Sequence, residues 1–259
     1  MKVLLLLCCV VAWLTVAPPS ASAEKPANLL EKKTFTDAQG KTLSYRLLKP
    51  VNEDPKQSYP LVVFLHGAGE RGSDNTAQLT HGVGDFAREE NRKNYPCFLI
   101  APQCPSGAKW SDVDWGAEKH VMPKEPSESG RLTLELIAAM QKEHRIDPKR
   151  IYITGLSMGG YGTWDLIARR PELFAAAVPV CGGGDEATAA VMAKIPIWAF
   201  HGDKDGAVKV SRSRNMIEAL KKAGGEPKYS EYAGVGHDSW VKAYSDPEMM
   251  KWLFAQKRP

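Results

Sequence analysis

Residues 151–159 have the sequence IYITGLSMG and carry the strongest local signal in the chain. The β-branched run 151–154 is typical of a buried strand, and Gly155 and Gly159 flank Ser157 in the pattern G-x-S-x-G. Small residues at these two places let the backbone turn sharply between a strand and a following helix. The stretch therefore predicts a strand, a tight turn and a helix, with the hydroxyl of Ser157 presented at the turn as a nucleophile.

Short apolar runs like the one before this turn recur along the chain. They lie at 61–65, 98–101, 174–180 and 197–200. Each is too short for a helix and suits a strand that is buried on both faces. Segments with helical spacing alternate with them at 132–144, 160–170 and 210–223. The alternation predicts a mostly parallel sheet with helices on both faces.

The order of these elements also bounds the domain organisation. Two alternating segments around the turn 37–40 predict an antiparallel hairpin at the amino-terminal edge of the sheet. With 259 residues, 43% of them hydrophobic and 25% charged, the chain has ordinary globular composition and length for one sizeable core. Together with the G-x-S-x-G turn, this predicts a single α/β-hydrolase catalytic domain over 24–259, and the spacing leaves no room for a large cap domain.

The first 23 residues differ from the rest of the chain. Lys2 gives a short positive region, an unbroken low-polarity run follows at 3–17, and 21–23 form a small-x-small pattern. These features predict a signal peptide at 1–23, cleaved after Ala23, and a secreted or periplasmic protein. A transmembrane anchor is the alternative, but the apolar run is shorter than the roughly 20 residues that a spanning helix needs. No later stretch is apolar enough to span a membrane, so stable membrane insertion is not expected.

A base for the proposed nucleophile can be selected by chain order. A serine hydroxyl is a weak nucleophile at neutral pH, so it needs a base within hydrogen-bond reach and an acid that orients the base. In this fold the three follow the order serine, acid, histidine. Four of the six histidines precede Ser157, and His201 precedes the late acids. His237, in the loop after the strand-like segment 228–232, remains as the catalytic base.

The acid should lie at the end of another strand, where functional loops gather in open α/β sheets. Asp203 and Asp205 both follow the apolar run 197–200. Asp205 is favoured, because Asp203 suits a turn residue that hydrogen-bonds its own loop. Asp185 or Glu186, one strand earlier, is the reserve candidate.

Hydrolysis also needs donors for the negative charge that develops on the substrate oxygen. One is expected from the backbone N–H of Met158, directly after the nucleophile. The other is expected from the loop 66–72, whose glycines allow the backbone to approach a substrate closely. Ala68 is the candidate in that loop, with Gly69 as the alternative.

No cofactor and no metal site are expected. The segment 82–87 matches G-x-G-x-x-A, but no strand precedes it, so dinucleotide binding lacks its context. The segment 203–206 has part of a calcium-loop pattern, yet Arg214 stands where the bidentate glutamate would be. The histidines show no paired metal-ligand spacing. The formal net charge is +4 with no basic run interleaved with aromatics, so nucleic acid is not an expected partner.

Three cysteines follow the expected cleavage site: Cys97, Cys104 and Cys181. The odd count leaves at least one unpaired within the chain. Cys97 and Cys104 stand at opposite ends of a strand-like run, which holds them too far apart to bridge. No disulfide framework is expected, and Cys181 should be a buried small hydrophobe rather than a nucleophile.

Four segments together resemble a known group of enzymes: 66–72, 155–164, 201–205 and 236–240. They are similar to segments of compact esterases related to polyhydroxybutyrate depolymerases, phospholipase/carboxylesterases and predicted peptidases. The resemblance covers nearly the whole chain after residue 23, and it implies the α/β-hydrolase fold, the triad and an ester substrate. In that group the second aspartate after His201-Gly202 is the triad acid, which supports Asp205 over Asp203.

Three functional hypotheses follow. The first, implied by the resemblance, is a serine carboxylesterase that works through an acyl-enzyme and acts on acyl or feruloyl esters of polysaccharides. The second is a serine peptidase related to prolyl-oligopeptidase catalytic domains, and the third is a non-catalytic binding module on the same fold. A small-molecule or polymer-linked ester is the expected partner, and the sequence does not indicate an oligomeric state. Trp110, Trp115 and Trp240 are candidates for contacting substrate, with simple packing an equal alternative for the first two.

Overall fold

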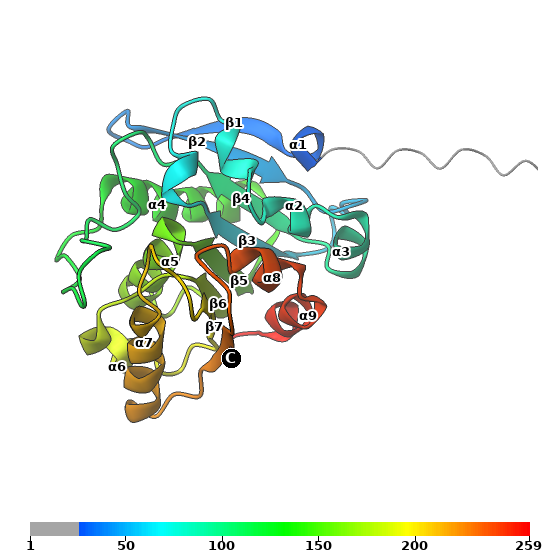
Figure 1. Ribbon diagram of the computed structural model, residues 1–259. Coiled ribbons are helices and arrows are strands. Elements are labelled where there is room, and N and C mark those ends of the chain that lie inside the picture. The colour runs from blue at the N-terminus through cyan, green and yellow to red at the C-terminus, as the bar shows by residue number, and fades with distance from the viewer. Residues whose placement is uncertain (1–25) are drawn as a thin grey trace, which may run out of the picture.

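An eight-stranded mixed sheet runs through the centre of the molecule (Figure 1). The computed structural model describes residues 26–259, and the expected signal peptide at 1–23 lies outside the described residues. The strands are β1 (Glu31–Thr36), β2 (Thr42–Leu48), β3 (Tyr59–Leu65), β4 (Phe98–Pro102), β5 (Ile146–Leu156), β6 (Ala176–Val180), β7 (Trp198–Gly202) and β8 (Lys228–Tyr232). Their order across the sheet is β1-β2-β4-β3-β5-β6-β7-β8.

The strand directions match the sequence-based expectation. The pairs β1–β2 and β2–β4 are antiparallel, and β4, β3, β5, β6, β7 and β8 pair in parallel. The chain therefore leaves these last six strands at one common edge of the sheet. This edge is where loops from distant parts of the sequence meet.

Helices cover both faces of the sheet (Figure 1). The α-helices are α1 (Pro26–Leu29), α2 (Val83–Phe86), α3 (Glu89–Asn94), α4 (Glu128–Glu143), α5 (Met158–Arg169), α6 (Ala189–Met192), α7 (Ser211–Lys222), α8 (Trp240–Ser245) and α9 (Pro247–Ala255). Short 3₁₀ turns are η1 (Ala68–Glu70), η2 (Ala77–Leu79) and η3 (Glu186–Thr188). The architecture is the α/β-hydrolase fold that the sequence predicts.

Two apolar cores lie on the two faces of the sheet, because successive residues of a strand point to opposite sides. In β3, which is buried along its whole length, Leu61, Val63 and Leu65 belong to the core formed with α4, α5 and α7. Val62 and Phe64 belong to the core formed with α2, α8 and α9. A strand buried on both faces needs an unbroken apolar sequence, which is why these runs are visible in the sequence.

Some boundaries differ from the expected ones. Strand β5 begins at Ile146, before the apolar run 151–154. The sequence pattern missed this start because residues 147–150 are mostly polar and at least partly exposed and give no apolar signal. Helix α4 begins at Glu128, where the hydroxyl of Ser127 accepts a hydrogen bond of 3.0 Å from the amide of Gly130. Helix α9 is absent from the sequence-based elements, although Asp246 caps it and a proline occupies its first turn.

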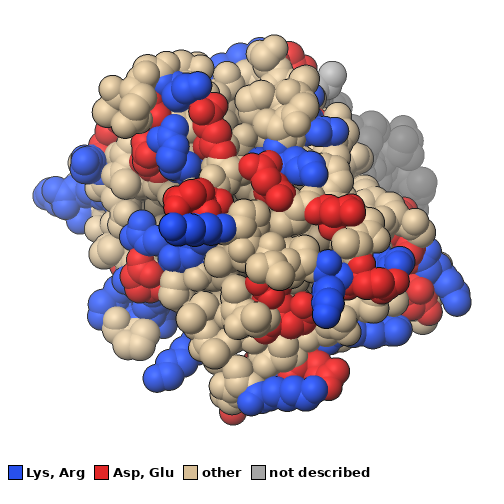
Figure 2. Space-filling view, turned by 90° about the vertical axis from the view of Figure 1, so that its left-hand side faces the viewer, with Lys and Arg blue, Asp and Glu red and all other residues tan. Residues whose placement is uncertain are grey.

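The connection from β4 to α4, residues 103–127, contains neither helix nor strand. In the described part of the chain, no helix is long and apolar enough to cross a bilayer. Figure 2 shows the face over which this connection lies, with lysine and arginine side chains next to aspartate and glutamate side chains across it. The two signs of charge are therefore mixed on this face.

Close backbone contacts fix the turn between β5 and α5. A Cβ atom added at Gly159 would lie 1.9 Å from the carbonyl oxygen of Leu65, and one added at Gly155 would lie 2.4 Å from the carbonyl oxygen of Gly159. Both distances are far inside van der Waals contact with backbone atoms that cannot move away. Glycine at these two positions therefore lets the turn pack directly against the end of β3.

Replacement of Gly159 by alanine should be strongly destabilising. We expect Gly159→Ala to lower the free energy of unfolding by about 3 kcal/mol or to prevent folding, because the added methyl group overlaps the backbone of β3. Chemical denaturation followed by circular dichroism measures this. Gly206→Ala is the matched control, since a Cβ there would meet no heavy atom within 4 Å. Equal unfolding free energies for the two variants would contradict this packing.

Candidate active site

Ser157 occupies a strained turn at the end of β5. Its φ of 54° and ψ of −118° lie in a region that residues with a side chain rarely adopt. Two backbone hydrogen bonds hold it there: the Ser157 amide donates to the Val180 carbonyl at 3.0 Å, and the Tyr161 amide donates to the Ser157 carbonyl at 3.1 Å. The strain holds the hydroxyl out at the edge of the sheet, where the sequence pattern places it.

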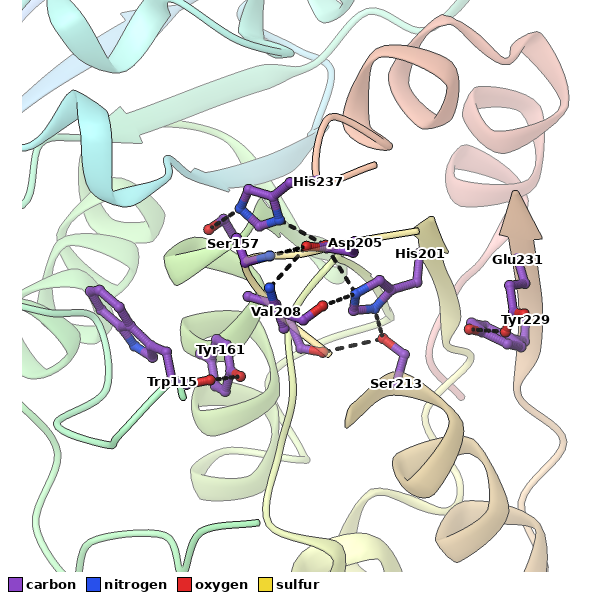
Figure 3. A network of polar contacts seen from close by, with 12 residues as sticks. Trp115, Ser157, Tyr161, His201, Asp205, Val208, Ser213, Tyr229, Glu231 and His237 are labelled. Carbon is purple, nitrogen blue, oxygen red and sulfur yellow. Dashed lines mark hydrogen bonds and ion pairs between the residues drawn. The ribbon is translucent and has the colours of Figure 1, made fainter. Parts of the chain in front are cut away.

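Ser157, His237 and Asp205 form a continuous hydrogen-bonded chain (Figure 3). The imidazole Nε2 of His237 lies 2.9 Å from the hydroxyl of Ser157, and its Nδ1 lies 2.7 Å from Oδ2 of Asp205. An ionised carboxylate only accepts, so Nδ1 carries the hydrogen and Nε2 is left to accept from the serine. This arrangement has the geometry that acyl transfer requires of a nucleophile, a base and an orienting acid.

The carboxylate of Asp205 is buried and surrounded by donors. Its Oδ1 accepts from the amides of Ala207 at 2.8 Å and Val208 at 2.9 Å. Burial opposes the negative charge, but hydrogen bonds from His201, His237 and these amides outweigh it and hold the pKa of Asp205 well below its usual range. Asp205 therefore remains ionised wherever the protein is folded at moderate pH.

The alternative acids lie elsewhere. Asp203 accepts a hydrogen bond of 2.7 Å from the amide of Gly234, so it bonds to the loop after β8 and not, as expected, to its own loop. Asp185 caps η3 and accepts from the amide of Met122 at 2.8 Å, and Glu186 lies 4.0 Å from the guanidinium of Arg212. Of these acids, the structure brings Asp205 to His237.

His201 contacts Asp205, and the sequence pattern alone does not reveal this contact. Chain order excludes it as the base, and its side chain is completely buried at the end of β7. Its Nε2 lies 3.2 Å from Oδ2 of Asp205, the same oxygen that faces His237. The available signal was the spacing of four residues between His201 and Asp205 across a strand end.

The two candidate oxyanion donors both begin helical turns. Met158 is the first residue of α5, and Ala68 is the first residue of η1. Amides in the first turn of a helix lack partners within the helix and favour an anion. Both turns follow strands that pair directly, since Leu65 of β3 lies opposite Gly155 of β5.

The loop that carries Ala68 is braced by a buried histidine. His66 accepts from the amide of Cys104 at 2.9 Å through Nε2, and its Nδ1 lies 2.6 Å from the carbonyl of Gly67. Burial is the main reason why the pKa of His66 is lowered to about 4, so the ring is neutral and Nδ1 donates. The guanidinium of Arg71 also donates to the Ala68 carbonyl, at 2.9 Å.

The expectation that Trp110 contacts substrate is wrong. Its side chain has no exposed surface, so it offers no face on which a substrate could stack. The indole N–H donates to the carbonyl of His66 at 3.0 Å, and the ring packs edge-on against the His66 imidazole. Trp110 therefore packs against the loop that carries Ala68 and helps to fix its position.

The other two tryptophans keep part of their surface exposed. Trp240 packs edge-on against the imidazole of His237, with 5.2 Å between the ring centres. Trp115 lies under two cations, with Arg71 at 5.9 Å and Lys109 at 4.8 Å from the ring centre. Its carbonyl accepts from the hydroxyl of Tyr161 at 3.1 Å (Figure 3). A contact of either tryptophan with substrate remains a proposal.

One group of possible metal ligands occurs among residues 26–259. Ligand atoms of Cys181, Asp205 and His237 lie within 4.8 Å of one another. Asp205 and His237 already bond to each other there, and burial raises the pKa of the Cys181 thiol. The thiol is therefore a neutral packing group at neutral pH, and the other two residues are already used by the hydrogen-bonded chain.

Comparison with known proteins finds one matching family and several related enzymes. The sequence profile of the Dienelactone hydrolase family matches residues 116–248, more than half of the chain. Poly(3-hydroxyalkanoate) depolymerase C of Paucimonas lemoignei is 30% identical over 53% of this chain. A bifunctional acetylxylan esterase/xylanase of Neocallimastix patriciarum is 29% identical over 72% of this chain. The chain spans 31% of the depolymerase and 25% of the esterase/xylanase.

A solved structure supports the fold along most of the chain. The crystal structure of a thermostable esterase superposes with a TM-score of 0.84 and is 41% identical in sequence. The match covers 90% of this chain and 64% of the esterase chain. This likeness and the family profile agree with the resemblance to compact esterases that the sequence suggests.

The three cysteines should be unreactive in the folded protein. All three are free and buried, and burial raises the pKa of Cys97 to about 12 and that of Cys104 to about 11. Since the thiolate is the reactive form, labelling should begin only as the pH approaches these values. With protein lacking residues 1–23, a disulfide reagent at pH 8 should label no thiol in the native state and three in denaturant. Rapid labelling of native protein at pH 8 would contradict this burial.

Proposed function

The chain belongs to the dienelactone hydrolase family, and from that membership we propose that it is a secreted serine hydrolase of carboxylic esters. The hydrogen-bonded chain from Ser157 through His237 to Asp205 is the observation that carries the proposal. A leader at 1–23 with the composition of a signal peptide supports secretion or export to the periplasm.

The first step is acylation. His237 Nε2 accepts the proton of the Ser157 hydroxyl as its oxygen attacks the ester carbonyl carbon, and the carbonyl electron pair moves onto oxygen. Nδ1 keeps its hydrogen bond to Asp205, which stabilises the imidazolium that forms. The carbonyl re-forms as the bond to the leaving alcohol breaks, and Nε2–H protonates that alcohol. The acyl group is then esterified to Ser157.

The second step is hydrolysis of the acyl-enzyme. A water molecule gives a proton to Nε2 as its oxygen attacks the acyl carbon, and Nε2–H then protonates the departing Ser157 oxygen. The carboxylic acid leaves and the resting state is restored. Only neutral His237 can accept these protons, so activity should fall on the acid side. Asp205 stays ionised over this range, because its pKa is held well below the usual value.

The oxyanion is stabilised by the amides of Met158 and Ala68 in this proposal. Each begins a helical turn, and the two turns follow the adjacent strands β5 and β3. Preorganised donors of this kind contribute about 10²- to 10³-fold in rate. The hydrogen bonds of His66 within the loop support the fixed position of the Ala68 amide that the mechanism requires.

For the substrate class, we propose an acyl group carried on a larger alcohol, such as an acylated or feruloylated polysaccharide. The depolymerase and the acetylxylan esterase among the relatives act on polymers that contain esters, which supports this class. The partly exposed side chains of Trp115 and Trp240 are the candidate surfaces for a sugar or aryl group.

A panel of substrates tests the proposed function. We expect turnover of p-nitrophenyl acetate and butyrate, and of methyl ferulate or acetylated xylan, because an ester has an alcohol as leaving group. Ser157→Ala should lose at least about 10⁴-fold in kcat. A proline-containing amide completes the panel. Amide cleavage without ester turnover would favour a peptidase, and inertness toward every compound would favour a binding module.

The two loop aspartates should differ sharply in effect. Asp205→Asn should lower kcat by about 10⁴-fold, because an amide at this position favours the wrong tautomer of His237. Asp203→Asn is the control in the same loop, and it should stay within about twofold, since an asparagine can still accept from the Gly234 amide. Steady-state ester hydrolysis measures both. Equal losses in the two variants would overturn the assignment of Asp205.

A further inference from the structure

The carboxylate of Asp205 has no lone-pair site to spare. Its Oδ1 accepts from two amides, those of Ala207 and Val208. Its Oδ2 faces two imidazoles, His237 at 2.7 Å and His201 at 3.2 Å. An ionised carboxylate offers about four lone-pair sites, so these four donors fill its capacity. Asp205 is therefore shared between two histidines (Figure 3).

The surroundings of His201 fix which of its nitrogens carries the hydrogen. Its Nε2 faces Oδ2 of Asp205 and, at 3.0 Å, the carbonyl of Val208, and both of these groups can only accept. Nε2 therefore carries the hydrogen and shares it between them. Its Nδ1 lies 2.7 Å from the hydroxyl of Ser213 in α7, whereas that hydroxyl lies 3.2 Å from the carbonyl of Gly182. Since Nδ1 faces Ser213 and Nε2 faces Asp205, the donor to the carboxylate is Nε2–H whichever way the Ser213 hydroxyl is turned.

We propose that His201 is a positioning residue for the Ser157–His237–Asp205 chain: its Nε2–H holds Oδ2 of Asp205 in place and limits the negative charge that Asp205 presents to His237. This inference rests on the proposed function, because it assigns a purpose to a contact of the same site. His201 touches neither substrate nor nucleophile and acts through Asp205.

Two consequences follow if this donor is removed. Oδ2 then has His237 as its one remaining side-chain donor, so the carboxylate is less firmly oriented. Its charge also falls more fully on His237, which favours the imidazolium over the neutral ring. Since only the neutral ring can accept the Ser157 proton, the acid limb of the activity profile should move to higher pH.

Other ionisable groups near this site stay in one state over the measured range. Burial raises the pKa of the Cys181 thiol at the end of β6 and of the Tyr161 hydroxyl in α5. In β8, a hydrogen bond from Arg214 is the main reason why the pKa of Glu231 is lowered to about 2. None of these three groups titrates between pH 5 and 9 on these shifts.

Two more ionisable side chains lie nearby and are the same in every variant compared. Asp238 follows His237 in the chain and is exposed. His81 packs against Trp240, with 5.3 Å between the ring centres, and Trp240 in turn packs against His237. Their contribution to the pH profile is therefore common to wild type and to the variants at residue 201.

A pair of substitutions separates the hydrogen bond from packing. His201→Leu fills much of the same volume without a donor, whereas the amide of His201→Gln can reach the place of Nε2 and donate to Asp205. We expect the leucine variant to lose about 10- to 100-fold in kcat/KM, the range for one hydrogen bond to a charged group. Its acid limb should move up by about 0.5 to 1 pH unit. The glutamine variant should recover most of the rate and the wild-type limb.

The measurement is the pH dependence of two reactions from pH 4 to 9. One is hydrolysis of p-nitrophenyl acetate, and the other is phosphonylation of Ser157 by a fluorophosphonate, which requires the activated serine but no ester turnover. If wild type reacts with the fluorophosphonate but hydrolyses no ester, the proposed function fails while the His201 comparison is still made on labelling rates. If both reactions occur, both profiles should show the same shift.

Thr154→Val is the matched control. Its buried hydroxyl donates to the carbonyl of Val178 at 2.7 Å, in β5 and away from Asp205. It should lower thermal stability without moving the acid limb. If His201→Leu does not fold, His201→Asn replaces it, because the shorter amide reaches toward Ser213 rather than Asp205. The proposal would be overturned if the leucine or asparagine variant kept the wild-type rate. It would also be overturned if the leucine and glutamine variants lost rate equally and the acid limb did not move.

Discussion

The hydrogen bond from His237 to Asp205 is the contact on which the site depends, and the pairing of β7 with β8 makes it possible. Gly202 lies opposite Tyr232 at the ends of these strands, so the two following loops leave the sheet side by side. The Lys204 amide donates to the Val235 carbonyl at 2.9 Å, and a Cβ at Gly202 would lie 2.3 Å from that same carbonyl oxygen. The loops thus pack backbone against backbone. The proposed base and the proposed acid, which are 32 residues apart, therefore meet at 2.7 Å.

The proposed nucleophile, Ser157, is placed by a different constraint, which is local backbone strain. A positive φ at a non-glycine residue costs on the order of 1–3 kcal/mol and persists only where the surroundings enforce it. Here β3 and β6 enforce it from both sides, because Gly159 packs on the Leu65 carbonyl and the Ser157 amide donates to the Val180 carbonyl. The buried bracing of the Ala68 loop by His66 belongs to the same packed edge. The position of the site is therefore set by backbone contacts with the strands of the sheet.

The fold and the meeting of Ser157, Asp205 and His237 could be predicted from the sequence, because each signal was local. These signals were an apolar run, a glycine-flanked serine, and an aspartate or histidine just after a strand. The sequence was insufficient where tertiary packing decides. Trp110 looks the same in the sequence whether it is exposed or buried, and only the structure shows it beneath His66. The contact of His201 with Asp205 likewise depends on side-chain direction at a strand end, which residue spacing does not specify.

The proposed mechanism requires that Ser157 carry the acyl group during turnover. Mixing the protein with p-nitrophenyl butyrate, quenching in acid within the first turnover and digesting with trypsin isolates the peptide 151–169, bounded by Arg150 and Arg169. Mass spectrometry should find this peptide heavier by one butyryl group, with the modification at Ser157, and should find no such adduct in Ser157→Ala. An ester turned over at full rate without that adduct, or an adduct on another residue, would contradict the mechanism.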